Sequence, residues 1–243
     1  LQDRGYTTTL IKFETLLTDL GIQGRVGRLT LLKSAKDLVD GASREGADTV
    51  VAVGNDITLS QVAQAVLKHP KITVGFVPLG TQHQTIAQLL GIPLGLLSCH
   101  VLSSRIVASL AIGKINNQYF LQSVSANGTP TLLCEGSYEV ALDRPHEVRI
   151  CNLDRAAETE SAESSLPTNQ LVACITPTPA KGFGLFRSAR PRASLFPLQE
   201  LRLSSSGDEL PLMVDNYRVL KTPAVITLAT QKLRMIVGKK RLL

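Results

Sequence analysis

Two strand-like runs, each followed by a glycine-containing loop and a helical stretch, constrain the fold of this chain more than any other feature. The runs are Thr49–Val53 and Ile72–Val77, which are continuous, apolar and rich in β-branched residues. Such runs are typical of parallel strands that are covered on both faces. Because strands alternate with helices here, the sequence predicts a right-handed parallel α/β layer.

Helical spacing on both sides of these runs supports the alternation. Apolar residues recur at helical positions over residues 8–20, and Gly21 follows as a stop signal. The stretch Ile86–Ser104 has no charged residue, but Gly91 and Pro93 interrupt it, so we expect a buried helix, a turn and a second helix rather than a membrane span. The other expected elements are a short strand over Arg28–Leu32 and helices over residues 34–45, over residues 59–68 and up to Leu90.

The pattern changes at about Asn116, where helical spacing fades and short runs recur between Gly, Pro, Asn and Asp residues. This predicts a second domain of mostly antiparallel, sandwich-like β structure. We expect an α/β domain over residues 1–115 and a β-rich domain over residues 116–243, with the C-terminal segment either staying there or returning to the first domain. The expected strands are Tyr119–Val124, Thr131–Leu133, Ser137–Leu142, Glu147–Ile150, Leu171–Ile175, Leu198–Leu203, Leu212–Val214 and Ala224–Ala229.

Composition narrows the class of partner. The 243 residues carry a formal net charge of +6 at pH 7, no Trp and only 4% aromatic residues. The positive charge favours phosphate esters or acidic lipid surfaces. Because few aromatic side chains could stack on bases, no nucleic-acid partner is expected. The four cysteines are widely spaced and no signal peptide is visible, so we expect reduced, partly buried thiols in a cytoplasmic protein.

The loops after the two runs, Gly54–Gln61 and Pro78–Gln84, are the candidate site. In open α/β sheets, ligands bind at the carboxyl ends of the strands, where helix N-termini offer free N–H groups. Phosphate binding and ordinary helix capping both explain these loops. The residues that fit the spacing of a capping box are Thr58 with Gln61, and Thr81 with Gln84.

Around these loops the sequence resembles the diacylglycerol kinase catalytic domain family. The run ADTVVAVGNDITLSQVAQAVL (Ala47–Leu67) is similar to the family pattern D-x-V-V-x-x-G-G-D-G-T-x-N-E-V. The run VGFVPLGTQHQTIAQLLGIP (Val74–Pro93) is similar to P-L-G-T-x-N-D-F-A-x-x-L-G-I-P, in the same order and spacing. Met213–Tyr217 is similar to V-D-G-E, so the likeness covers most of the chain, although the family's first strand has no counterpart.

The resemblance implies a two-domain lipid kinase, related in fold to the NAD kinases, that transfers phosphate from ATP to a lipid or another hydroxyl-bearing small molecule. It implies ATP and Mg²⁺ at the two loops and a substrate domain after them. Gly54, Asp56 and Thr58 would belong to the nucleotide loop, with Asp56 beside the phosphates and as the metal ligand. The other cofactor-binding candidates in the two loops are Gly80 and Thr81, which match the family, and Asn55 and His83, which do not.

By the same resemblance, Asp215 is the catalytic candidate. It would be the general base that takes the proton from the acceptor hydroxyl, which requires a carboxylate close to that oxygen. The local sequence leaves a second interpretation open, in which Asp215 and Asn216 form a turn between two strands. Tyr217 stands where the family has Glu.

The departures from the family patterns bear on activity. Asn55 and Ile57 stand at glycine positions, and a β-branched Ile at positive φ would be strongly disfavoured, so we expect the loop to differ. Ser60-Gln61 and Gln82–Gln84 replace Asn-Glu and Asn-Asp pairs, the latter with one extra residue. Phosphoryl transfer depends on metal ions and positioning, so losing these carboxylates is expected to impair it.

Three functions therefore stay open: an ATP-dependent lipid kinase, a catalytically dead pseudokinase that acts as a binding or regulatory module, and a binder of another phosphate-containing ligand. A basic window, Lys181–Arg192, interleaves four positive charges with apolar residues. It is either a solvated loop or a peripheral contact with an anionic membrane surface.

Overall fold

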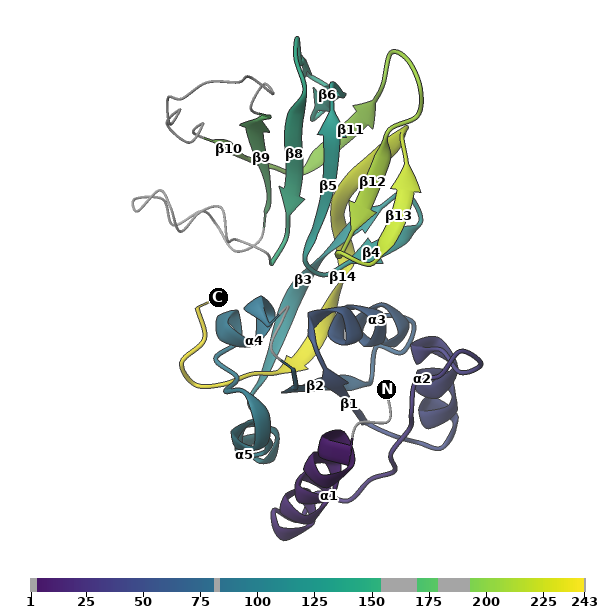
Figure 1. Ribbon diagram of the computed structural model, residues 1–243, viewed down its shortest axis with the longest axis vertical. Helices are drawn as coiled ribbons and strands as arrows, with labels where there is room; N and C mark the ends of the chain where they lie inside the picture. Colours follow the sequence, from purple (N-terminus) through teal and green to yellow (C-terminus); the bar gives the residue numbers. More distant parts are fainter. Residues whose placement is uncertain (1–3, 81–83, 154–169, 179–192, 243) are drawn as a thin grey trace. The chain divides into compact units, whose positions relative to one another are not determined.

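The computed structural model describes residues 4–80, 84–153, 170–178 and 193–242, with side chains from residue 10 onward. The chain divides into two compact units, one of residues 1–110 with 232–243 and one of residues 111–231 (Figure 1). Three features singled out in the sequence lie outside the described residues: Thr81, His83 and the basic window Lys181–Arg192.

The predicted parallel layer is present in the first unit. Strand β1 (Thr49–Gly54) pairs in parallel with β2 (Thr73–Pro78), from Thr49 opposite Thr73 to Gly54 opposite Pro78. The C-terminal end of β14 (Ala224–Ile236) joins β2 in parallel. The helices of this unit are α1 (Arg4–Asp19), α2 (Ala35–Arg44), α3 (Asp56–Val66), α4 (Thr85–Leu89) and α5 (Ser98–Ser104), with a 3₁₀ turn, η1, over Gly95–Leu97.

Local capping explains where the first two helices end and begin. Helix α1 stops at Gly21, whose φ of +72° lets the chain turn back. The N–H of Ile22 then donates to the carbonyl of Leu17 at 2.8 Å. Helix α2 begins with a capping box between Ser34 and Asp37. The stop at Gly21 was predicted from the sequence, and the helix expected over residues 34–45 is present, although its capping box was not predicted.

The prediction of a strand over Arg28–Leu32 is wrong. No helix or strand is assigned to residues 22–34, and Leu31 and Leu32 are 106% and 93% exposed. The Thr30 hydroxyl oxygen instead accepts hydrogen bonds from the backbone N–H groups of Leu32 and Lys33, at 3.3 and 3.1 Å. Local bonds of this kind offer the backbone an alternative to a sheet ladder when no neighbouring strand pairs with it.

The charge-free stretch folds as a helix, a turn and a second helix, as predicted. Helix α5 packs closely on β2, since a Cβ built on Gly75 would lie 2.5 Å from a methyl group of Leu102. An apolar cluster that includes Phe13, Val77 and Ile236 joins α1 to the sheet. In the described parts of the chain, every helix is too short or too polar to cross a membrane.

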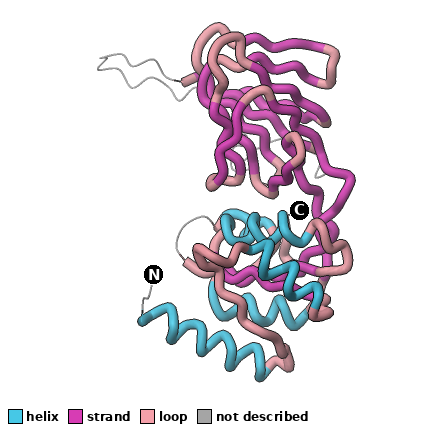
Figure 2. The backbone as a smooth tube through the Cα atoms, turned by 90° about the vertical axis from the view of Figure 1, so that its right-hand side faces the viewer, coloured by secondary structure: helices cyan, strands magenta, loops and turns pink. Residues whose placement is uncertain are grey.

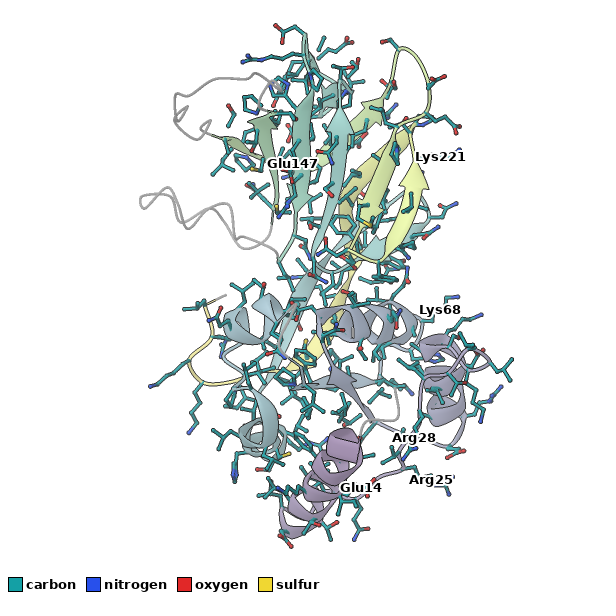
Figure 3. The ribbon with its side chains drawn as sticks, in the orientation of Figure 1. Glu14, Arg25, Arg28, Lys68, Glu147 and Lys221 are labelled. Atoms are coloured by element: carbon teal, nitrogen blue, oxygen red, sulfur yellow. The ribbon has the colours of Figure 1, made fainter. Side chains whose placement is uncertain are left out.

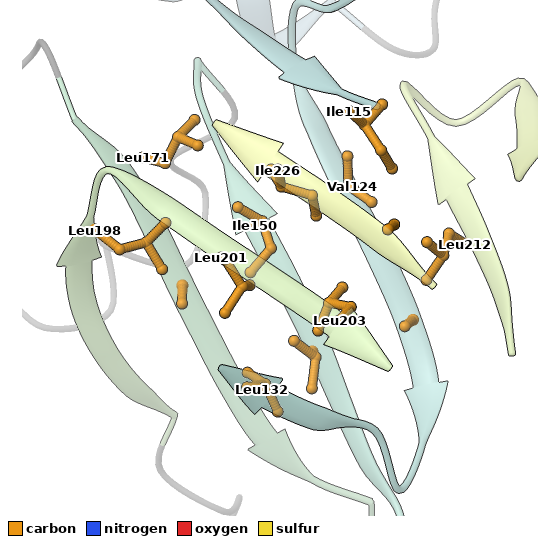
Figure 4. Packing of buried hydrophobic residues seen from close by; sticks show 14 of the residues in the cluster. Ile115, Val124, Leu132, Ile150, Leu171, Leu198, Leu201, Leu203, Leu212 and Ile226 are labelled. Atoms are coloured by element: carbon orange, nitrogen blue, oxygen red, sulfur yellow. The ribbon is translucent and has the colours of Figure 1, made fainter. Parts of the chain in front are cut away.

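The second unit is built of strands (Figure 2). A six-stranded antiparallel sheet runs in the order β10-β9-β8-β5-β12-β13, and β14, β11, β6 and β7 form a second layer with β3 and β4. Buried residues of both layers, among them Leu132, Ile150, Leu201 and Ile226, point toward one another (Figure 4). The strands are β3 (Val107–Ile115), β4 (Gln118–Phe120), β5 (Ser123–Gly128), β6 (Thr131–Cys134), β7 (Tyr138–Ala141), β8 (His146–Cys151), β9 (Leu171–Pro177), β10 (Ser194–Leu198), β11 (Glu200–Ser204), β12 (Pro211–Val214) and β13 (Arg218–Lys221).

The predicted fold class, an α/β domain followed by a mostly antiparallel β domain, is confirmed. Two predicted strands are each divided: the run Tyr119–Val124 between β4 and β5, and the run Leu198–Leu203 between β10 and β11. Strands β3 and β13 were not predicted. Strand β10 pairs with β9 in one sheet, whereas β11 pairs with β6 and β14 in the other. The chain therefore changes sheets at Gln199, which apolar spacing does not reveal.

All four cysteines are described, and all are buried free thiols. Burial is the largest cause that raises the pKa values of Cys99, Cys134 and Cys174 above the ordinary thiol value. Such thiols are poorly nucleophilic at neutral pH. The prediction of reduced, buried cysteines is confirmed.

A hydrogen bond between His69 and Asp40 links the chain after α3 to α2, and it predicts a pH dependence of stability. His69 Nε2 lies 2.7 Å from Asp40 Oδ1, and this bond is the main cause that lowers the pKa of Asp40 below 3.8. A carboxyl group whose pKa is lowered by folding stabilises the fold at pH values above its pKa in the unfolded chain. This stabilisation is lost as the pH falls through its pKa in the folded chain.

The His69→Ala variant tests this pH dependence. Its urea midpoints, measured from pH 6 to pH 3, should fall less steeply below about pH 4 than those of the unmodified chain. His100→Ala, at an exposed histidine, should leave the profile unchanged; identical profiles for both variants would contradict the link.

Candidate nucleotide-phosphate site

Both candidate loops leave the same edge of the parallel sheet. Gly54 pairs with Pro78 at the carboxyl ends of β1 and β2, and the N–H of Leu79 donates to the Gly54 carbonyl at 2.7 Å. Helix α3 follows the first loop and α4 follows the second (Figure 1). The shared edge is therefore as predicted. That the loops face each other across a cleft stays a prediction, because residues 81–83 are not described.

In the first loop, the residues cap a helix. The Asn55 side-chain oxygen accepts hydrogen bonds from the backbone N–H of Thr58 at 3.2 Å and from its hydroxyl at 3.3 Å. Helix α3 therefore starts at Asp56, and the predicted capping box of Thr58 with Gln61 is wrong. Asn is more favourable than Thr at an N-cap, which agrees with a helix that begins after Asn55.

The cap formed by Asn55 and Thr58 requires glycine at position 54. The φ of Gly54 is +153°, and a Cβ there would lie 2.6 Å from the Thr58 hydroxyl oxygen. Ile57 lies in the first turn of α3 and does not have a positive φ, which agrees with the expectation that an Ile here excludes the glycine-type loop conformation. Ile57 therefore fits this loop without backbone strain.

Asp56 holds the starts of two helices together. Its side chain is 1% exposed, and Oδ2 accepts a hydrogen bond at 3.3 Å from the N–H of Ile86, which is fully buried in α4. The two residues lie 30 positions apart in the sequence. A carboxylate in this position stabilises the arrangement of the loop helices.

The second loop retains a conformation that only glycine adopts easily. Gly80 has a φ of +106°, and among the described residues the Gln84 amide nitrogen lies 3.9 Å from a Cβ built there. That amide donates to the Gly80 carbonyl. Helix α4 begins at Thr85, after Gln84 at its N-cap. The capping box expected of Thr81 with Gln84 includes Thr81, which lies outside the described residues.

In the second unit, Asp215 lies in the turn between β12 and β13. Asp215 and Asn216 have φ values of +49° and +60°, and the N–H of Tyr217 donates to the Val214 carbonyl at 3.2 Å. Two successive residues with positive φ are typical of a type I′ hairpin turn. The turn interpretation of this motif is confirmed, whereas a role as general base stays a prediction.

The Asp215 carboxylate is buried and accepts hydrogen bonds from the backbone. Its exposure is 1%. Oδ1 accepts from the N–H of Gln122 at 2.7 Å and of Ser123 at 3.3 Å, and Oδ2 accepts from the N–H of Leu121 at 2.9 Å. Hydrogen bonds from several N–H groups favour the ionised form of a carboxyl group. This carboxylate therefore fixes the start of β5 to the hairpin.

Two further polar residues around this carboxylate were not found by sequence reasoning. The Arg218 guanidinium donates to the Tyr119 carbonyl at 2.9 Å and lies 5.6 Å from the centre of the Tyr217 ring. The Asn152 amide donates to the carbonyls of Ala111 and Leu121. These partners lie 31 to 99 positions apart, and no local motif marks them.

The described residues do not form a magnesium site by themselves. Beside a nucleotide, Mg²⁺ is usually held by one or two carboxylates together with phosphate oxygens and water. Among residues 4–80, 84–153, 170–178 and 193–242, no group of three or more His, Cys, Asp or Glu is placed to hold a metal ion. Asp56, the implied metal ligand, is buried and contacts Ile86. Gly80 keeps a φ of +106°, a backbone conformation that is common in loops whose N–H groups bind anions.

Comparisons with known proteins agree with this architecture. Residues 4–115 match the family model of the diacylglycerol kinase catalytic domain, which confirms the resemblance seen in the sequence. A search of curated proteins finds no match. A diacylglycerol kinase from Bacillus anthracis superposes with a TM-score of 0.71 at 16% identity, covering 96% of this chain and 92% of that chain. An NAD kinase from Archaeoglobus fulgidus in complex with ATP gives 0.60 at 14% identity, covering 96% and 91%.

Proposed function

We propose that this chain, whose residues 4–115 carry a diacylglycerol kinase-like catalytic domain, is a kinase-like protein impaired in phosphoryl transfer that acts as a binding module for a phosphate-bearing ligand such as ATP. One observation carries the proposal. Asp56 and Asp215, the two carboxylates that the family motifs retain here, are each 1% exposed and accept hydrogen bonds from backbone N–H groups.

A general base has to come within hydrogen-bonding distance of the hydroxyl that it deprotonates. To do so, the Asp215 carboxylate would leave the N–H groups of Leu121, Gln122 and Ser123. Each buried donor left without an acceptor costs about 1–3 kcal/mol. We infer that proton transfer by Asp215 to or from a lipid hydroxyl is unfavourable in this protein.

Features suited to phosphate binding are retained at the loop edge. The loops that follow β1 and β2 share one edge, and Gly80 keeps a positive φ. Backbone N–H groups in such loops bind anions without a catalytic carboxylate. Binding of a phosphate group and loss of turnover are therefore compatible in one site.

Calorimetry with ATP, with and without Mg²⁺, tests the proposal together with phosphate transfer to diacylglycerol in mixed micelles. We expect weak ATP binding that changes little with Mg²⁺, and no phosphorylated lipid. Gly80→Ala should abolish the binding heat, because a side chain at a φ of +106° strains the loop backbone. Gly136→Ala is the matched control, since Gly136 also has a positive φ but lies in the second unit.

Two results would contradict the proposal. Tight, Mg²⁺-dependent ATP binding with phosphate on the lipid would show an active lipid kinase. Equal loss of binding heat in both glycine variants would show that the loop edge is not the binding site.

A further inference from the structure

The segment Gln23–Lys33, between α1 and α2, exposes apolar side chains to solvent and is called the basic-apolar loop below. Single exposed apolar residues are ordinary on protein surfaces, whereas a cluster of them marks an interaction site. The exposed residues of this loop are Val26 at 59%, Leu29 at 42%, Leu31 at 106% and Leu32 at 93%.

Contacts within the first unit hold this loop in shape. A Cβ built on Gly27 would lie 3.1 Å from a methyl group of Leu38 in α2, so the loop backbone lies close against that helix. At the tip, the N–H of Thr30 donates to the Lys33 carbonyl at 3.1 Å. Together with the bonds to the Thr30 hydroxyl, this closes a turn that presents Leu31 and Leu32 outward. A preformed loop loses little conformational entropy when it binds.

The charge of the loop is of one sign. Arg25, Arg28 and Lys33 lie within it, and the sequence has no Asp or Glu between Asp19 and Asp37. The Arg25 side chain is 85% exposed and reaches Glu45 at 2.7 Å. Figure 3 shows Arg25 and Arg28 on this part of the chain, directed away from the ribbon. Positive charges therefore lie on both sides of the two outward leucines in the sequence.

We propose that the basic-apolar loop docks the protein on an anionic lipid bilayer. Leu31 and Leu32 enter the boundary between head groups and acyl chains, while Arg28 and Lys33 contact acidic head groups. Apolar insertion and attraction to anionic lipid add together in such interfacial segments, and stable binding usually needs both. This surface is separate from the loops after β1 and β2, and the inference does not depend on the proposed phosphate binding.

The charge argues against a second copy of the chain as the occupant. Two copies that meet through this loop would bring like charges together around an apolar contact, which is unfavourable. An anionic bilayer is complementary to both properties of the loop, since its head groups neutralise Arg28 and Lys33 and its interior accepts Leu31 and Leu32.

Co-sedimentation of the full chain with vesicles tests the inference. We expect binding to vesicles of phosphatidylcholine with phosphatidylserine, little binding to phosphatidylcholine alone, and weakening as salt is raised. The variants Leu31→Ser with Leu32→Ser, and Arg28→Gln with Lys33→Gln, should each lower binding at least about tenfold. Val219→Ser, at a 57% exposed residue of β13, and Lys68→Gln with Lys71→Gln, at exposed lysines, are the matched controls and should bind like the unmodified chain.

Several outcomes would overturn the inference: no binding to the anionic vesicles, binding unchanged in both loop variants, or equal losses in the controls. Sedimentation equilibrium without vesicles adds a further check. If the unmodified chain is a dimer that the two serine substitutions convert to a monomer, the loop is a contact between copies. The Gly80→Ala variant should still bind vesicles, so failure of the ATP experiment and failure of this one can be told apart.

Discussion

Replacing Asp215 by Ala should lower the free energy of unfolding of the second unit by about 3 kcal/mol or more, because each buried donor that loses its acceptor costs about 1–3 kcal/mol. The reason is that the N–H groups of Leu121, Gln122 and Ser123 would lose their acceptor inside the unit. Asp215→Asn keeps one acceptor oxygen and should cost less. Urea denaturation measures the energies, and amide hydrogen exchange should show faster exchange at residues 121–123.

Asp143→Ala is the control for this prediction, because Asp143 is an exposed carboxylate of the same unit. It should leave both stability and exchange nearly unchanged. If Asp215→Asn instead kept full stability and nucleotide affinity but lost measurable lipid phosphorylation, Asp215 would act as a general base and the impaired-kinase proposal would fail.

Replacing Asp56 by Ala should lower the stability of the first unit by about 2–4 kcal/mol, since a buried donor loses a charged acceptor. The affected donor is the N–H of Ile86, so its hydrogen exchange should speed up along with that of the start of α4. Asp48→Ala is the control, because the Asp48 side chain is 81% exposed in the same unit.

The sign of the change in the free energy of unfolding on Asp56→Ala distinguishes two roles for this residue. Residues kept for ligand or metal binding are often held at a cost to stability, so replacing them is neutral or stabilising. An increase in stability for Asp56→Ala would therefore favour a metal or phosphate contact over the structural role that the contact with Ile86 indicates.

Local features of the fold could be predicted because their causes lie within a few residues. The apolar runs at Thr49–Val53 and Ile72–Val77 identify parallel strands by composition alone. Gly21 and the pair Ser34 and Asp37 mark helix boundaries through bonds that span only one turn. The order of two strand-loop-helix segments also predicted that both loops share one sheet edge.

The start of α3 was misplaced for a local reason. Asn55 and Thr58 both cap helices well, and propensity alone does not decide between two good caps three residues apart. Extending the helix back to Asp56 brings that carboxylate to Ile86, so a contact from a distant segment accompanies the earlier start.

By itself, the sequence determined the two classes of domain, the loop edge and the family resemblance, because apolar spacing and short motifs are properties of neighbouring residues. Only the tertiary structure decided what the motif carboxylates do. Asp215 meets backbone groups 92 to 94 positions away, and Asp56 meets one 30 positions away. The tertiary structure also decided that Arg28–Leu32 is not a strand. A strand needs hydrogen-bonding groups from another segment of the chain, and a local sequence pattern cannot show whether such a segment lies beside it.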